Sequence, residues 1–193
     1  NSLLATRQLT PLWKPHYTLP ENGPAGLEET VYWLDYQGVR IIILNGSEKL
    51  EEQRDWLARL LRKNPAPWTV VGIHQQLFST GSDRDNPELQ KLFLPIVDQN
   101  RVDLVLQGHD HTYGRTYPLK GGHIAAGGEK GTVYVVSSSG AKFYEQNPRY
   151  LNLMAKTTLD TQLFQVIEVG ENTLHFRAET ANGDVVDEFT LTK

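Results

Sequence analysis

Short apolar runs recur along the first two thirds of the chain and alternate with stretches in which apolar residues have helical spacing. The near-continuous runs predict buried strands, in a sheet that has helices on both faces or that packs on another sheet. The first two runs are separated only by Gln37-Gly38 and therefore predict a hairpin. We expect these strands at residues 31–36, 39–44, 68–73, 102–106 and 132–137.

Two amphipathic helices are predicted between the strands. The first runs from about residue 48 to 63, with Ser47 as its N-cap, acidic residues near its start and basic residues near its end. The second has Asn86 as its cap and Pro87 at its first position, and Pro95 should kink it. Their apolar faces are Leu50, Leu57, Leu60 and Leu61 in the first helix, and Leu89, Leu92, Phe93, Ile96 and Val97 in the second.

The last third of the chain shows strict alternation, which is typical of half-buried strands. Leu174, Phe176 and Ala178 alternate with polar neighbours, and Asn182-Gly183 predicts a hairpin before a strand at 185–192. The fold class is therefore α/β, ending in an antiparallel β-meander.

The chain has 193 residues, which predicts one domain or slightly more. We place a first part at residues 1–160 and a β-meander, packed on the same domain, at 161–193. Residues 1–30 and 140–160 show neither period and are expected to be irregular.

Composition narrows the class of protein without naming a function. Hydrophobic residues make up 39% of the chain and charged residues 22%, as in ordinary globular proteins. A net charge of −4 and a pI near 5.9 give no electrostatic argument for nucleic acid or an acidic membrane. The chain has no cysteine and no apolar run near the roughly 18 residues of a membrane span. It starts with Asn1-Ser2 rather than Met, so we expect that residues upstream have been cut away.

Three histidines follow the predicted strands directly and form the candidate site. His74 follows the strand at 68–73, and Gly108, His109 and His111 follow the strand at 102–106. Open α/β sheets bind ligands at the carboxyl ends of their strands, and neutral imidazole is a favoured ligand of zinc, iron and manganese. A lone histidine is usually a surface or hydrogen-bonded residue; the placement of these three raises the odds of a metal site.

Other polar residues receive structural interpretations. Asp110, between the two histidines, should face the other way, and Asp103 should be a structural hydrogen-bonding residue. His16 lies in a Pro-rich loop, His123 in a Gly-rich loop and His175 on the polar side of a strand, so none of the three is expected to bind metal.

Several stretches, in one order, resemble the calcineurin-like metallophosphoesterases, and most closely the purple acid phosphatase branch. Residues 108–115 match the family motif Gly-His-x-His-x-Tyr-x-Arg, which is specific in this context. The resemblance covers roughly residues 11–140. The individually weaker matches are residues 13–23, 32–36, 39–44, 53–57, 68–74 and 131–137.

The resemblance implies the C-terminal half of a four-layer α/β/β/α sandwich and the hydrolysis of a phosphate ester. It implies that His74 and His109 bind one ion of a dinuclear pair and that His111 binds the other, the ions being Fe, Zn or Mn. Such a pair holds the substrate and activates hydroxide for in-line attack. Tyr113 and Arg115 would then face the substrate, although a structural role is equally consistent with the sequence.

The family's remaining ligand segments, Asp-x-His, Gly-Asp-x-x-Asp and Gly-Asn-His, do not occur in this chain. Gln76 also stands where the family often has proline. We therefore expect a fragment whose partner is the missing N-terminal half of the same domain, and which alone binds metal weakly and is inactive. The exposed sheet edge left behind could also support a dimer.

Two further interpretations stay open. The chain could be a degenerate phosphoesterase-like domain that acts as a non-catalytic binding or scaffold module, or a β-rich carbohydrate- or protein-binding module. We expect the loops at residues 79–85 and 121–131 to border the pocket, but neither specifies a substrate. The family resemblance is compatible with a secreted or periplasmic protein, while the sequence itself indicates no compartment.

Overall fold

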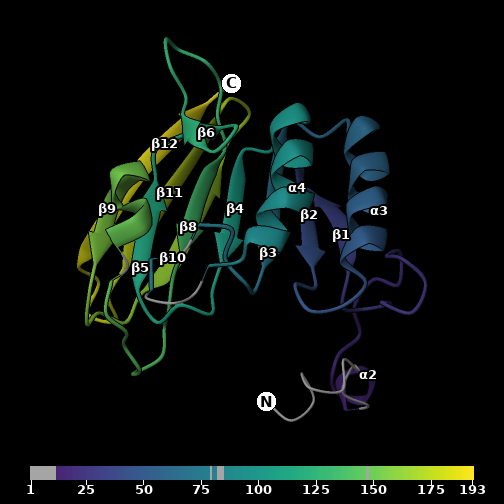
Figure 1. The fold of residues 1–193 in the computed structure, drawn as a ribbon, viewed down its shortest axis with the longest axis horizontal. Coiled ribbons are helices and arrows are strands. Elements are labelled where there is room, and N and C mark those ends of the chain that lie inside the picture. The colour runs from purple at the N-terminus through teal and green to yellow at the C-terminus, as the bar shows by residue number, and fades with distance from the viewer. Residues whose placement is uncertain (1–11, 79, 82–84, 147) are drawn as a thin grey trace.

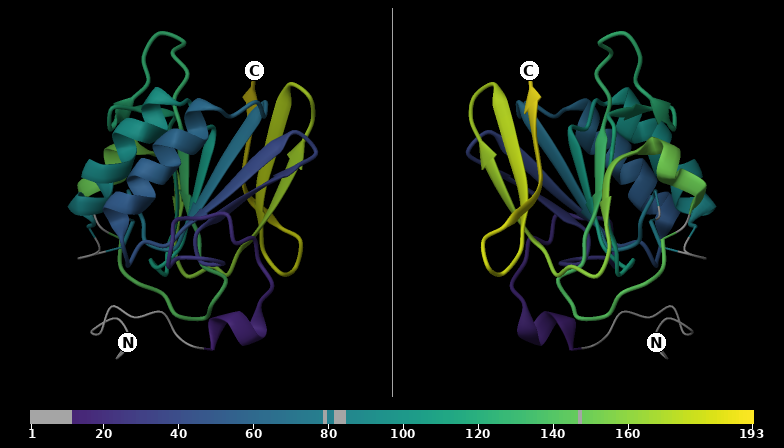
Figure 2. Two further views of the ribbon diagram at one scale, coloured as in Figure 1. Left: turned by 90° about the vertical axis from the view of Figure 1, so that its right-hand side faces the viewer. Right: turned by 90° about the vertical axis from the view of Figure 1, so that its left-hand side faces the viewer.

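A layer of helices, a large sheet and a small sheet lie against one another in the computed structural model (Figure 1). Helices α3 (Leu50–Arg62) and α4 (Pro87–Gln99) cover one face of the large sheet, and the small sheet lies against its other face (Figure 2). None of the helices in the described part of the chain has the length and apolarity needed to cross a membrane. The structure describes residues 12–78, 80–81, 85–146 and 148–193.

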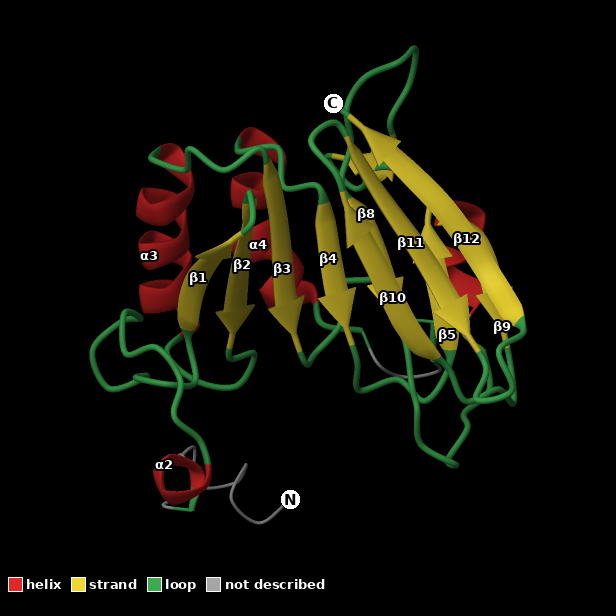
Figure 3. Cartoon of the chain, turned by 180° about the vertical axis from the view of Figure 1, so that it is seen from behind, coloured by secondary structure: helices red, strands yellow, loops and turns green. Residues whose placement is uncertain are grey.

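The large sheet has seven strands in the order β1-β2-β3-β4-β8-β5-β9. Strands β2, β3, β4 and β8 run parallel to one another, whereas β1, β5 and β9 pair antiparallel with their neighbours. This parallel centre places the carboxyl ends of β2, β3 and β4 along one edge of the sheet (Figure 3). The strands are β1 Tyr32–Tyr36, β2 Val39–Leu44, β3 Trp68–Ile73, β4 Leu104–Gln107, β5 Tyr113–Thr116, β8 Val133–Val136 and β9 Met154–Thr158.

The small sheet is the meander predicted for the end of the chain, with β10 (Phe164–Val169), β11 (Thr173–Glu179) and β12 (Val185–Thr192) in sequence order. A third sheet is a two-stranded hairpin of β6 (Leu119–Lys120) and β7 (His123–Ile124). Short helical turns complete the described elements: α2 at Trp13–His16 and a 3-10 helix, η1, at Pro148–Leu153.

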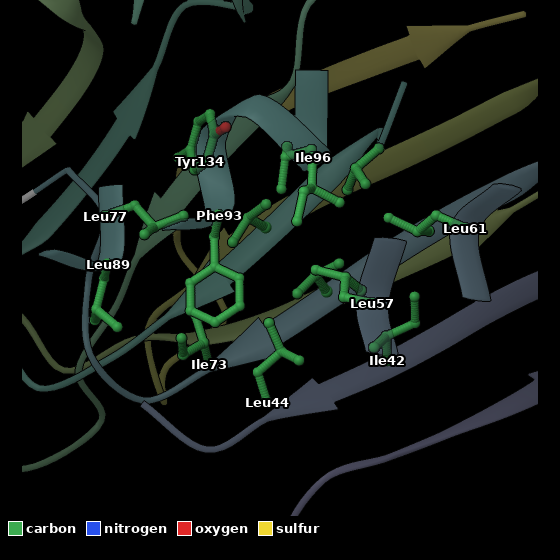
Figure 4. Close-up of a cluster of buried hydrophobic side chains, with 14 of the residues drawn as sticks. Ile42, Leu44, Leu57, Leu61, Ile73, Leu77, Leu89, Phe93, Ile96 and Tyr134 are labelled. Atoms are coloured by element: carbon green, nitrogen blue, oxygen red, sulfur yellow. The ribbon is translucent and has the colours of Figure 1, made fainter. Parts of the chain in front are cut away.

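Two hydrophobic cores hold the layers together. On the helix side, Leu57 of α3 and Phe93 of α4 pack over Ile42, Ile73 and the other strand residues (Figure 4). Leu57 and Ile42 are fully buried, and Phe93 is 1% exposed, so this face of the sheet is closed to water. Burying each such side chain contributes about 1.5–3 kcal/mol.

The second core lies between the two sheets. The alternating residues Leu174, Phe176 and Ala178 of β11 are fully buried there, as their spacing predicted. They meet Trp68 and Val70 of β3. The seven-stranded sheet thus has helices on one face and a sheet on the other, while the boundary at residues 160 and 161 stays a prediction.

The start of the first helix differs from the prediction. Its N-cap is Lys49, in the left-handed conformation with φ 46°, and no side chain caps the helix. Ser47 instead accepts a hydrogen bond from the side chain of Gln75. The buried side chain of Gln53 organises this turn, because it bonds both the N–H and the C=O of Asn45. The predicted Ser47 cap was therefore wrong.

Two strands of the large sheet escaped prediction, as did the short β6–β7 hairpin. Strand β5 begins two residues after His111, and β9 lies in the stretch 140–160 that was expected to be irregular. Both are short and lack a clear alternation, and each pairs with strands distant in sequence. Pro95 lies inside α4, as expected, within a helix that is continuous from Pro87 to Gln99.

Candidate metal centre

The three candidate histidines lie at the carboxyl ends of two adjacent parallel strands. Ile73, the last residue of β3, is in register with Gln107, the last residue of β4. The ladder extends one step further, since the N–H of Gly108 donates to the carbonyl of His74 at 3.1 Å. Strand register therefore brings the residue after β3 against the loop that carries His109 and His111.

His74 and His109 face each other across this edge. Nδ1 of His109 lies 3.2 Å from Nε2 of His74, and the ring centroids are 5.1 Å apart at an interplanar angle of 76°. Two nitrogens bound to one tetrahedral zinc at about 2.0–2.1 Å would be about 3.3 Å apart. The two rings are thus at the separation of an N–H···N hydrogen bond, which is also the separation that two ligands of a single ion require.

The sharp turn of this loop falls on His109 rather than on Gly108. His109 has φ 66°, in the left-handed region, whereas Gly108 has no positive φ. Gly108 instead lets its backbone lie close to the ring of His74, because a Cβ at this position would already lie 3.4 Å from Nδ1 of His74. The histidines therefore do not project from one extended segment: the turn at His109 sends this side chain toward His74.

His111 has different surroundings. Its Nδ1 lies 2.9 Å from the carbonyl oxygen of Lys142, and its ring meets that of Tyr144 edge-on at 4.9 Å. A carbonyl only accepts, so Nδ1 carries the proton and donates, which leaves the lone pair on Nε2. Metal-binding histidines usually have such a partner on the second nitrogen. His111 is therefore prepared to bind a cation through Nε2.

The chain by itself does not assemble a complete metal site. Within the described residues, no three His, Cys, Asp or Glu side chains form a group that could hold an ion. Among the described residues, the candidate donors are one imidazole pair and one separate imidazole. These residues fit part of a dinuclear centre, and the assignment of His74, His109 and His111 as ligands stays a prediction.

A cavity of about 840 Å³ lies beside the histidine pair. His74 and His109 form part of its wall, and residues from the ends of β2 and β3 form another part. Two buried acceptors in this wall, Oε2 of Glu29 and Oε1 of Gln75, have no hydrogen-bond partner among the described residues. The cavity therefore offers both volume and unsatisfied polar groups next to the candidate ligands.

Tyr113 and Arg115 lie elsewhere, in a buried network between the sheets. The Tyr113 hydroxyl donates to Oδ2 of Asp187 on β12 at 2.7 Å, and Arg115 donates to both oxygens of this carboxylate at 2.7 and 2.9 Å. Arg115 also stacks over the ring of Phe189. These contacts match the structural alternative for both residues, and their role as substrate contacts stays a prediction.

Burial and the contact with Asp187 raise the pKa of Tyr113 well above its usual range. Burial alone would lower the pKa of Arg115, but the hydrogen bond and charge of Asp187 outweigh burial and raise it. Both groups keep their neutral-pH protonation states. Asp187 carried no sequence signal for this role, because it is more than 70 residues away in the chain.

The remaining polar residues have ordinary partners. Asp110 is buried and accepts from Gln76, Thr80 and Gly81, so it faces away from the histidines as expected. Asp103 accepts from the N–H of Thr69, as a structural residue would.

The histidines that were not expected to bind metal have their own surroundings. Nδ1 of His16 lies 2.6 Å from the carbonyl of Leu12, and His175 lies between Glu168 and Glu188. His123 is exposed on β7.

The two loops expected to border the pocket have separate outcomes. The loop at 79–85 lies partly outside the described residues. The stretch 121–131 contains β7 and the turn between β6 and β7, and its end shares a cavity with Asp103, which directly precedes β4. That is the opposite end of β4 from His109 (Figure 1), so this expectation was wrong.

Comparison with known proteins identifies the family. The model of the calcineurin-like phosphoesterases matches residues 9–113, which is more than half of the chain. The chain belongs to the calcineurin-like phosphoesterase family. Within it, the chain lies on the purple acid phosphatase-like branch: purple acid phosphatase 7 of Arabidopsis thaliana is 27% identical over 138 residues, covering 69% of this chain and 38% of the relative.

Other similarities cover shorter stretches or rest on the fold. An uncharacterised protein of Mycobacterium tuberculosis is 42% identical over 76 residues, which are 36% of this chain and 14% of that protein. The yellow lupin (Lupinus luteus) purple acid phosphatase PPD1 has a TM-score of 0.78 at 22% identity, over 91% of this chain and 34% of that one. The chain thus spans 14% of the length of the Mycobacterium tuberculosis protein and 38% of that of purple acid phosphatase 7.

Proposed function

We propose that this chain is the histidine-bearing part of a dinuclear metallophosphoesterase that hydrolyses phosphomonoesters or phosphodiesters. The family generally uses a dinuclear metal centre. The observation that carries the proposal is the pair of nitrogens, Nε2 of His74 and Nδ1 of His109, 3.2 Å apart at the carboxyl ends of β3 and β4. His111, with its tautomer set by the Lys142 carbonyl, supplies the third ligand.

Each histidine has a distinct part in this proposal. His74 and His109 would hold one ion, and His111 would hold the second through Nε2, with Fe, Zn or Mn as candidates. The bound ions would supply Lewis-acid polarisation of the phosphoryl oxygen and a lower pKa for water. The residues of this chain orient the ligands: the strand register fixes His74 and the loop conformation fixes His109.

The partner in this proposal is the rest of the same domain. Within the described residues, no three potential ligands form a group, so the carboxylates that would complete the site would come from that partner. An apolar hollow of about 320 Å³ also lies between the open face of β1–β4 and β10, lined by Val39, Val70, Ile167 and neighbouring residues. Figure 3 shows β1 and β2 beyond the cover of the small sheet. Additional strands seated there would bury this surface.

Metal analysis and hydrolysis of p-nitrophenyl phosphate test the proposal. We expect this chain alone to bind metal weakly and to show no turnover, and a longer gene product with the upstream ligands to be active. His109→Ala should abolish activity in the longer protein, whereas the control His123→Ala should not. Two tightly bound ions together with turnover in the chain alone would overturn the expected division of the site.

One observation favours a second candidate function, a non-catalytic scaffold module. The absence of a three-ligand group within the described residues is what a degenerate domain would also show. The solved structure of GAP50, described as the anchor in the inner membrane complex of Plasmodium, has the same fold with a TM-score of 0.59 at 16% identity over 84% of this chain and 53% of that one. An inactive, metal-free longer gene product would favour the scaffold function.

The surface that would receive the missing part could instead pair two copies of this chain. Light scattering separates the two occupants: a monomer at high concentration that associates with the upstream part supports the proposal. A stable dimer that excludes the upstream part contradicts it.

A further inference from the structure

Asp110 stands between His109 and His111 in the sequence of the loop that follows β4, and its side chain is buried. It is 1% exposed, and its carboxylate turns toward the loop that follows β3. Three donors from that loop meet it: Nε2 of Gln76 at 2.8 Å and the backbone N–H groups of Thr80 and Gly81 at 2.9 Å each. Hydrogen bonds to a charged acceptor are roughly twice as strong as neutral ones, so this carboxylate ties the two loops firmly.

Other contacts show how closely the two loops approach. The hydroxyl groups of Thr80 and Thr112 are hydrogen-bonded to each other. A Cβ at position 81 would lie 3.1 Å from Cγ and Oδ1 of Asp110, so only glycine allows the backbone to come this near without displacing a neighbour. One of these loops begins at His74, and the other contains His109. Their docking therefore adds to the strand register in setting how the two imidazoles meet.

The backbone at His109 needs such support. A left-handed conformation, here φ 66°, is costly for a residue with a side chain and persists where the surroundings hold it. Asp110 is the next residue, and its N–H also closes a tight turn onto the carbonyl of Gly108 at 2.7 Å. An anchored Asp110 thus holds the turn that directs His109 toward His74.

We propose that Asp110 is a positioning residue of the metal centre: its carboxylate docks the loop after β3 on the loop after β4, so that Nε2 of His74 and Nδ1 of His109 meet at the separation of two ligands. The inference rests on the proposed function for its chemical purpose. It concerns metal-free geometry, however, and can be tested without any metal.

The test variant is Asp110→Ala in the whole chain, and Asp103→Ala is the matched control. Asp103 lies at the other end of the same strand and also accepts from a backbone N–H, that of Thr69, at 2.8 Å. Both variants remove a carboxylate from a loop next to β4, and only one of them is beside the histidines. Gln76→Met removes a single donor and serves as the milder variant if Asp110→Ala does not fold.

Two measurements are made on each protein. The first is the nuclear Overhauser effect between the ring protons of His74 and His109 in the metal-free chain, and the second is the Zn²⁺ affinity by calorimetry. We expect Asp110→Ala to lose the ring contact and to bind Zn²⁺ about tenfold more weakly, at the lower end of the effect of removing outer-shell partners. Gln76→Met should weaken both signals, and Asp103→Ala should keep both.

The outcomes separate the inference from the proposed function. Asp110→Ala, or Gln76→Met in its place, with an unchanged ring contact and Zn²⁺ affinity would overturn the positioning role, as would equal losses in Asp103→Ala. A wild-type chain that shows the ring contact but takes up no Zn²⁺ would count against the proposed function. The ring contact in the variants would then still decide the positioning role.

Discussion

Two regions of one short segment, Gly108–Arg115, have opposite surroundings. His109 and His111 lie at the partly exposed rim of the sheet, where one faces His74 and the other a backbone carbonyl. Tyr113 and Arg115, only a few residues later, enter the core between the sheets and meet the same carboxylate of Asp187. The rim offers nitrogen lone pairs to a cation, whereas the core network has every charge compensated.

One short sequence motif thus contains residues with different physical roles. The rim histidines are held by loops and strand ends, and the contacts His74–His109 and His111–Lys142 are exposed. The core network joins β5 to β12, so the loss of one member leaves buried polar groups unpaired. Substitutions in the two regions should therefore differ in their effect on stability.

Of the substitutions considered, Asp187→Ala should lower the free energy of unfolding most. The change leaves Arg115 and the Tyr113 hydroxyl buried without their acceptor, so we expect a loss of about 3–5 kcal/mol in the free energy of unfolding, measured in urea. Glu188→Ala is the matched control, because this neighbour on β12 has an exposed side chain and should cost less than about 1 kcal/mol. Equal effects of both substitutions would contradict the contrast.

High pH should weaken the core through its tyrosines. Burial and Asp187 raise the pKa of Tyr113, and burial followed by the charge of Asp98 raises that of Tyr134. A raised folded pKa gives stability that is complete below the unfolded value near 10 and is lost as pH rises beyond it. Each tyrosine should contribute a slope of about −1.4 kcal/mol per pH unit there.

Urea unfolding across this pH range, with tyrosine ionisation followed by absorbance, measures the slope. Tyr113→Phe should reduce the slope by about 1.4 kcal/mol per pH unit, which is the contribution of one proton. An unchanged slope in that variant would show that the raised pKa of Tyr113 does not couple to folding.

At neutral pH, Tyr113→Phe should have a moderate effect. The variant loses the hydroxyl that donates to Asp187, while Arg115 still donates to both carboxylate oxygens. We expect a loss of about 1–2 kcal/mol in thermal or urea unfolding. Tyr36→Phe, at a residue that is 63% exposed, should leave stability unchanged. A loss as large as that of Asp187→Ala would mean that the hydroxyl, and not the ion pair, dominates the network.

The smallest change in stability is expected at the rim. His74→Ala removes an exposed side chain and should shift the free energy of unfolding by no more than about 0.5 kcal/mol. Its Zn²⁺ affinity, measured by calorimetry, should nevertheless fall strongly, whereas His123→Ala should change neither quantity. A large loss of stability in His74→Ala would show that this histidine, like Asp187, is needed to hold the fold together.

Local patterns predicted much of the framework. Strand β3 occupies its predicted residues, 68–73, and the β11 residues that alternate in sequence are those that are buried. Asn86 and Pro87 stand at the start of α4 as predicted, and the proline takes the first helical position. The side chain of Asn86 does not cap the helix but donates to the carbonyl of Gln76. The predicted Ser47 cap was wrong for a physical reason. Gln53, from inside the helix, already hydrogen-bonds the backbone of Asn45 in the turn that a cap would have organised.

The candidate site was predictable in its residues but not in its geometry. The histidines follow recognisable strands, so their meeting at one edge could be expected. The left-handed backbone at His109 and the choice of nitrogen on each ring depend on contacts with distant segments. The position of strand β5 also depends on distant segments. It pairs with β8 and β9, which both follow it in sequence.

The hydrogen bond between His111 and the carbonyl of Lys142 has a consequence for how the site tolerates change. The acceptor belongs to the main chain, so almost any amino acid at position 142 would present the same oxygen to Nδ1. Sequence drift or engineering at this position can therefore alter the charge and size of the wall near His111 without reassigning its ring proton. The side chains of this loop can therefore change while a backbone carbonyl keeps the proton of His111 on Nδ1.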